Sequence, residues 1–119
     1  QHSKERYVYI KTLNNFIETL RDKTVFDNIR DWASERGIYD KGNSHTQYVK
    51  LMEEAGELAQ ALLKKDKAET IDAIGDIVVV LTNLAKLEGY NIENCIDAAY
   101  NEIANRKGKM INGTFVKNK

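Results

Sequence analysis

The sequence has no proline and a single cysteine, Cys95, among its 119 residues. Without proline, no residue of the chain forces a helix to end, and the many Ala, Leu, Glu and Lys residues favour helices. One cysteine excludes an intrachain disulfide and is typical of a reducing compartment. No apolar run approaches the roughly 20 residues that cross a bilayer. We therefore expect a cytoplasmic, non-membrane protein with one all-α domain over residues 1–119.

The chain also lacks net charge, because 18 basic residues balance 18 acidic ones. This balance argues against binding to a nucleic-acid polymer or to an anionic membrane. Histidine is scarce, and neither His2 nor His45 belongs to a Glu-x-x-His motif. The di-iron site of helical bundles is therefore excluded, and zinc would require nitrogen or sulfur ligands that the chain does not cluster.

Apolar residues recur at the spacing of helices in most of the chain. The predicted helical segments are 13–20, 25–37, 44–64, 67–88 and 92–107. Residues 1–10 fit either a helix start or an extended segment, and the glycines of 37–43 predict a loop. Within the tail, 109–116, the pair Asn112-Gly113 predicts a hairpin turn.

Helix starts are marked by residues that can cap a helix. Thr24 and Asn91 are expected N-caps, and Ser44-x-x-Gln47 and Asp66-x-x-Glu69 fit capping boxes. Between them, residues 77–81 (IVVVL) are apolar around most of a helix. A helix of this kind is buried on more than one side, so we expect a homodimer to cover it.

Acidic residues concentrate where the 44–64 and 67–88 helices approach each other. If the joint between them is a tight turn, Glu54 and Asp76 lie opposite each other on the two helices, because they are equidistant from Lys65. Carboxylates that face one another repel unless a cation lies between them. Asp76 is flanked by Ile and Val, where a carboxylate is costly to bury unless it is paired or metal-bound. An all-oxygen site favours Mg²⁺, with Mn²⁺ possible.

Other acids have structural explanations beside the functional one. Helical angles place Glu54 and Glu57 beside the core face and Glu53 toward solvent. Glu69 is explained first as a capping partner, and Asp72 lies near a helix N-terminus, where acids are favoured anyway. We expect Glu54, Glu57, Asp72 and Asp76 to hold the cation and Glu53 or Glu57 to accept a proton.

Magnesium usually completes its shell with water and substrate phosphate, so the acids predict phosphoanhydride chemistry. A phosphate substrate also needs polar or cationic partners, although basic residues at a helix C-terminus are common without any ligand. The candidates for binding substrate phosphates are Lys50, Asn101, Arg106, Lys107 and Lys109. For the base, the candidates are Gln47 and Trp32, the latter also explained as a core residue.

Residues 50–58 (KLMEEAGEL) and 74–77 (IGDI) resemble the MazG-like all-α nucleoside triphosphate pyrophosphohydrolases. The tail, 106–116 (RKGKMINGTFV), is similar to that of their phage-type and short bacterial members, and the resemblance covers about residues 28–117. It implies a four-helix-bundle core with antiparallel metal-binding helices, in a dimer or a dimer of dimers. It also implies magnesium-dependent cleavage of a (d)NTP to a (d)NMP and pyrophosphate.

The family pattern, Glu-Glu-x-x-Glu followed by Glu-x-x-Asp, implies roles for individual residues. Glu54, Glu57 and Asp76 match its metal ligands, and Glu53 matches the leading glutamate, which positions either water or a group that supports the ligands. The chain departs from the pattern at Ala73, where the family has glutamate. Asp72 or Glu69 could replace it, or the site could hold fewer metals.

Three other functions stay open at this point. Ala73 motivates a degenerate module that binds nucleotide or metal without hydrolysis, and a structural helical partner protein would not respond to magnesium with nucleotide. Phosphoribosyl-ATP pyrophosphohydrolases share the fold and the acids, and an assay of that substrate beside dNTPs would separate them. The residues do not distinguish the base, the sugar, the number of metal ions, or house-cleaning from control of a nucleotide pool.

Overall fold

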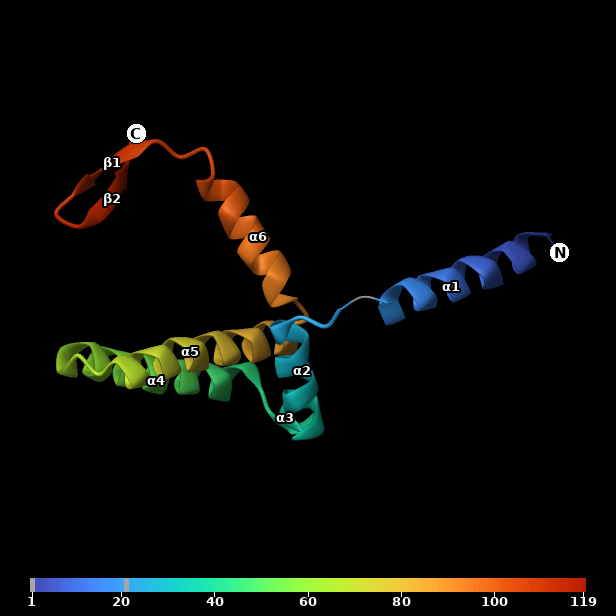
Figure 1. Ribbon diagram of the computed structural model, residues 1–119, viewed down its shortest axis with the longest axis horizontal. Helices are drawn as coiled ribbons and strands as arrows, with labels where there is room; N and C mark the ends of the chain where they lie inside the picture. The colour runs from blue at the N-terminus through green and yellow to red at the C-terminus, as the bar shows by residue number, and fades with distance from the viewer. Residues whose placement is uncertain (1, 21) are drawn as a thin grey trace.

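The computed structural model describes residues 2–20 and 22–119. Most of these residues are helical, which confirms the all-α class (Figure 1). The helices are α1 (His2–Leu20), α2 (Val25–Glu35), α3 (Ile38–Lys41), α4 (Ser44–Lys64), α5 (Lys67–Leu87) and α6 (Ile92–Ile103). A two-stranded hairpin follows, made of β1 (Gly108–Ile111) and β2 (Thr114–Lys117).

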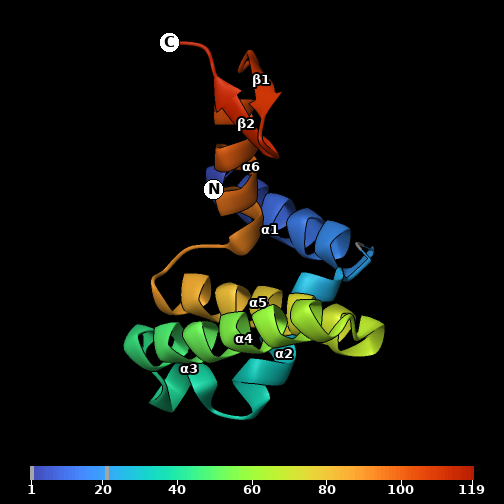
Figure 2. The ribbon, with the colours of Figure 1, turned by 90° about the vertical axis from the view of Figure 1, so that its left-hand side faces the viewer.

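The two long helices, α4 and α5, form an antiparallel pair that is the most extensively packed part of the fold (Figure 2). Lys65 makes the turn between them in the left-handed conformation, with φ of 55°. The Asp66 side chain then caps α5 by accepting a hydrogen bond from the Glu69 amide, at 3.1 Å. The predicted tight turn between the acidic helices is therefore confirmed.

The start of α4 differs from the prediction by one residue. Asn43 is the N-cap, and its side chain accepts a hydrogen bond from the Thr46 amide at 2.9 Å. Ser44 is already helical and its hydroxyl donates to Glu88, so the predicted capping box with Gln47 is wrong. Asparagine and serine are both good caps, and local sequence alone did not decide between neighbours.

Helix α2 packs against α5 after a capping box made by Thr24 and Asp27, as predicted for Thr24. The residues from Gly37 onward were expected to be a loop, but Ile38–Lys41 form one helical turn, α3. This turn is fastened to α5 by the Tyr39 hydroxyl, which donates to Asn83 Oδ1 at 2.6 Å. Because Asn83 is only 2% exposed, the bond also satisfies a buried amide oxygen.

Helix α6 leaves the C-terminal end of α5 after Gly89, which has φ of 85°, and ends at Ile103 rather than near the predicted residue 107. The predicted hairpin is confirmed, with Asn112 and Gly113 both at positive φ in its turn. Residues 2–20 form one continuous helix, α1, which resolves the ambiguity of the first residues. Within the described residues, no helix combines the length and apolar character that crossing a membrane requires.

A single copy of the chain does not close a four-helix bundle. Helix α1, helix α6 and the hairpin project away from the α4–α5 pair (Figure 1), and the Cα radius of gyration is 20.0 Å. A compact chain of this length would have about 14 Å. The accessible surface is 10110 Å², against about 6,600 Å² for a compact monomer of this mass. The fold therefore leaves an unusually large surface open for association.

Candidate functional site

The most unusual side chain on the α4–α5 pair is that of Glu54. Its residue is 6% exposed, and its Oε2 atom is buried without a hydrogen-bond partner. The nearest cation is Lys50, whose Nζ lies 3.7 Å from the other oxygen, Oε1. That separation is too long for a hydrogen bond. A buried carboxylate oxygen in this state is costly unless it meets a cation.

Two further carboxylates act on Glu54. Burial raises the pKa of the Glu54 carboxyl, and the charges of Glu57 and Asp76 raise it further, against a smaller opposing effect of Lys50. Glu57 lies one turn along α4, while Asp76 comes from the facing helix α5. The fold thus brings together the three acids that the turn symmetry and helical angles singled out. We call Glu54, Glu57 and Asp76 the acidic seam.

The acidic seam fits a hard divalent cation by its chemistry. All its donors are carboxylate oxygens, which Mg²⁺ and Mn²⁺ prefer, and one of those oxygens is buried with no partner. In the part of the chain that the structure describes, no three His, Cys, Asp or Glu side chains converge closely enough to form a metal shell. The seam therefore supplies the right ligands but not a preformed cage.

Position 73 carries alanine where the family pattern has glutamate, and the structure places this position relative to the other acids. Ala73 is buried, at 5% exposure, so position 73 faces the packed interior and Asp72, next to it, is exposed. A small cleft of 170 Å³ near the turn is lined by both Glu57 and Glu69, and Asp72 is not part of its lining. Glu69 is also one helical turn before position 73, on the same side of α5. Its placement makes it the better neighbour for Glu57.

A second cavity, of 400 Å³, lies between α2 and α5. We call it the α2–α5 cavity, and its lining residues are Val25, Asn28, Ile29, Trp32, Asp76 and Val79. Asp76 therefore belongs both to this cavity and to the acidic seam. Trp32 was a predicted contact for a base, whereas Asn28 was missed. The signal was available, because Asn28 lies one helical turn before Trp32 on the same face.

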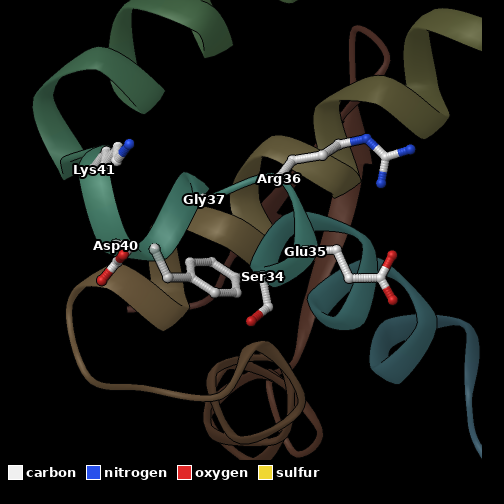
Figure 3. Close-up of a pocket in the computed structure, with 7 residues that line it drawn as sticks. Ser34, Glu35, Arg36, Gly37, Asp40 and Lys41 are labelled. Atoms are coloured by element: carbon white, nitrogen blue, oxygen red, sulfur yellow. The ribbon is translucent and has the colours of Figure 1, made fainter.

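A third concavity, of 640 Å³, surrounds the α2–α3 turn and is shown in Figure 3. All its lining residues come from the continuous segment 34–41, which carries Glu35 and Asp40 as well as Arg36 and Lys41. The charges cancel, and the surface offers no net attraction for a phosphate. Arg36 is engaged elsewhere, since its guanidinium lies 4.4 Å from the centre of the Trp32 ring.

An ion-pair network that the sequence did not suggest holds α6 to α2. The guanidinium of Arg30 binds both oxygens of Glu93, at 2.7 and 2.6 Å, and contacts Asp27 at 2.9 Å. Arg30 is half-buried, and the hydrogen bonds from Arg30 lower the pKa of the Glu93 carboxyl. Residues so far apart in sequence carry no local signal of pairing.

The residues predicted to bind substrate, apart from Trp32, are not gathered in one place. Lys50 is exposed on α4 beside Glu54, and Gln47 is half-buried one turn earlier. The others are all exposed, on α6 (Asn101), on the segment between α6 and β1 (Arg106 and Lys107) and on β1 itself (Lys109). Figure 1 shows that this part of the chain projects away from α4 and α5. A single copy therefore does not bring these cations to the acidic seam. Glu53 is exposed, as its helical angle predicts.

Comparisons with known proteins bear on the identity of this site. The family model described as phosphoribosyl-ATP pyrophosphohydrolase matches residues 14–102. A similar protein is an uncharacterized 18.2 kDa protein in the rep-hol intergenic region of Haemophilus phage HP1 (strain HP1c1). It is 36% identical over 79 residues, which are 66% of this chain and 45% of the phage protein. The chain thus spans less than half of that relative's length. No solved structure matches the chain.

Proposed function

Because this chain belongs to the phosphoribosyl-ATP pyrophosphohydrolase family, a family of pyrophosphohydrolases, we propose that it is a magnesium-dependent nucleoside triphosphate pyrophosphohydrolase. It would cleave a (d)NTP to a (d)NMP and pyrophosphate. The observation that carries this proposal is the unpaired buried oxygen of Glu54, beside Glu57 and Asp76. Asp76 also lines a cavity of the volume that small ligands occupy.

Glu54, Glu57 and Asp76 would hold the cation, Mg²⁺ by preference and Mn²⁺ as the alternative. Glu69 joins them in place of the family glutamate at position 73, with Asp72 as the less favoured candidate. A divalent cation, when bound, neutralises the phosphates and favours ionisation of the attacking water. The protein's own contribution is to present three carboxylates from two packed helices on neighbouring positions, so that a cation can draw them together.

The remaining roles follow from where each residue lies. Water attacks the α phosphorus, and pyrophosphate leaves from the opposite side. Glu53 or Glu57 accepts the proton from the water, and both are exposed enough to exchange it with solvent. Lys50 lies next to Glu54 and binds a phosphate oxygen, while Gln47 and Trp32 contact the nucleoside.

The second part of the proposal is a homodimer or a dimer of dimers. Its support is the large open surface, including Val78 in the apolar middle of α5, which is 37% exposed. A standard stable interface buries about 1,200–2,000 Å² in total, and the excess surface of one copy is larger than either partner's share. In such an assembly Asn101, Arg106, Lys107 and Lys109 of one copy would reach the acidic seam of another.

Two observations favour other functions specifically. The matched family is named for phosphoribosyl-ATP, so this nucleotide is the second candidate substrate. The absence of glutamate at position 73 favours a module that binds nucleotide without hydrolysis. A rise in Tm with nucleotide and Mg²⁺, without any release of pyrophosphate, would identify the second case.

The direct test is pyrophosphate release from a panel of NTPs and dNTPs with Mg²⁺. We expect turnover by the wild type and a loss of about 100-fold or more in Asp76→Asn and Glu57→Gln. Asp97→Asn is the matched control, because Asp97 is an exposed acid on α6, away from the seam. Absence of turnover on every nucleotide, or full activity of Asp76→Asn, would contradict the proposal.

A further inference from the structure

We propose that the α2–α5 cavity binds the unmodified nucleobase of the substrate and that Asn28 determines which base is preferred. The inference rests on the proposed function, since it takes the acidic seam to be the phosphate end of the site. Asp76 is the geometric link. It lines the cavity and also acts on Glu54, so a nucleotide with its phosphates at the seam has its base beside the cavity.

The cavity is built from one face of α2 and one turn of α5. Val25, Asn28, Ile29 and Trp32 recur on α2 at the i, i+3, i+4, i+7 spacing of a single helical face. Asp76 and Val79 are i, i+3 neighbours on α5. Because both helices are fixed by caps and mutual packing, the cavity has rigid walls. Its volume of 400 Å³ lies within the range of about 300–1,000 Å³ typical of small-molecule sites.

Its walls suit the faces of a flat aromatic ring. Val25, Ile29 and Val79 supply apolar surface, and Trp32 supplies an aromatic ring that can stack on a base. Trp32 is held in place from outside the cavity. Arg36 lies over the indole at 4.4 Å and also donates from Nη1 to the Trp32 carbonyl oxygen at 3.1 Å.

Asn28 supplies the hydrogen-bonding groups that would recognise the edge of the base. It is the one uncharged hydrogen-bonding side chain among the six cavity residues, apart from the indole N–H of Trp32. Within the described residues, its carboxamide makes no hydrogen bond to another group, so both its donor and its acceptor are available. A carboxamide can pair with two atoms of a base edge at once, which discriminates between bases.

The same residues disfavour a base that carries a ribose phosphate. None of the six cavity residues is Lys or Arg, and the one charged residue is the acid Asp76. Phosphoribosyl-ATP carries an additional ribose phosphate on its base, and this anion would enter a cavity with no cation to receive it. The Asp76 carboxylate would repel this anion, and no cation of the lining would offset that repulsion. The chain should therefore discriminate against the nucleotide for which its family is named.

The experiment separates binding from turnover. The binding of non-hydrolysable α,β-imido dNTPs of the four bases, with Mg²⁺, is measured by calorimetry for the wild type, Asn28→Leu and Asn28→Asp. We expect the wild type to prefer one base and Asn28→Leu to lose roughly tenfold of that preference. Asn28→Asp, which keeps an acceptor and loses the donor, should change the order of preference. Asn94→Leu, at an exposed asparagine of α6, is the control and should bind as the wild type does.

Unchanged base preference in both Asn28 variants would overturn the inference, as would phosphoribosyl-ATP binding as tightly as ATP. Circular dichroism of each variant shows that the helices persist, so a general loss of folding cannot imitate a change of preference. Pyrophosphate release is measured separately. Its absence in the wild type contradicts the proposed hydrolysis, whereas the base preference in the binding data still decides the role of Asn28.

Discussion

Replacing Glu54 by glutamine should stabilise the metal-free protein at neutral pH. The substitution keeps the shape of the side chain and removes its charge. In the wild type that charge is buried, with Oε2 unpaired and with Glu57 and Asp76 nearby. An unsatisfied buried polar group costs about 1–3 kcal/mol, and a charged one costs more. Glutamine still buries polar atoms, so we expect a gain of about 1 kcal/mol, equivalent to roughly 4 °C in Tm.

The pH dependence of this effect has a definite sign. Burial and the neighbouring acids raise the pKa of Glu54 in the folded protein above its usual value of 4.5. A group with a raised folded pKa favours folding while it is protonated and loses that contribution as pH rises through the folded pKa. The advantage of Glu54→Gln should therefore be largest at neutral pH, shrink as the pH falls through the raised folded pKa, and be absent below the usual glutamate pKa.

Thermal unfolding in the presence of a chelator, at several pH values, measures both effects. Glu53→Gln is the matched control, because Glu53 is the adjacent residue and is exposed. It should change stability by no more than about 0.5 kcal/mol. Adding Mg²⁺ should stabilise the wild type and Glu53→Gln but not Glu54→Gln. A Glu54→Gln protein that is less stable than the wild type without metal, or one that Mg²⁺ stabilises equally, would refute the reasoning.

Three further predictions concern neighbouring parts of the fold. Arg30→Met should lower the free energy of unfolding by about 1–2 kcal/mol in chemical denaturation, because it leaves Glu93 without its bidentate partner. Since Arg30 lowers the Glu93 pKa, this difference should shrink as the pH falls through that pKa. An equal cost at all pH values would contradict the prediction. Gly108→Ala should increase hydrogen exchange in the hairpin, because a Cβ there would clash with the Val116 carbonyl oxygen. Unchanged protection would contradict this. Glu69→Gln should weaken the Mg²⁺-dependent rise in Tm more than Asp72→Asn does, and the reverse order would return Asp72 to the site.

Local signals in the sequence predicted much of the helical framework. Thr24 and Asp66 cap helices as expected, because a cap depends on a side chain and an amide only three residues away. Asn112-Gly113 turns the hairpin for a similarly local reason. The resemblance to the MazG-like pyrophosphohydrolases is confirmed by the family match. Where two good caps adjoin, as at Asn43 and Ser44, local propensity did not decide between them.

The acids of the candidate site could be predicted in part, because a tight turn between antiparallel helices determines which residues of the two helices lie opposite one another. The charge of Asp76 accordingly raises the pKa of Glu54 across the helix pair. The preference for Glu69 over Asp72 needed the structure, since it depends on which side of α5 faces the cleft beside Glu57. The position of α6 and its cations could not be predicted, because it depends on the distant pair Arg30–Glu93.

The most direct test of the central claim is the fate of the oxygen that hydrolysis adds. The reaction is run with Mg²⁺ and the preferred NTP in ¹⁸O-labelled water, and the products are separated and analysed by mass spectrometry. Attack at the α phosphorus predicts products of nucleoside monophosphate and pyrophosphate, with one ¹⁸O in the monophosphate and none in the pyrophosphate. Label in the pyrophosphate, or products of nucleoside diphosphate and phosphate, would contradict the account.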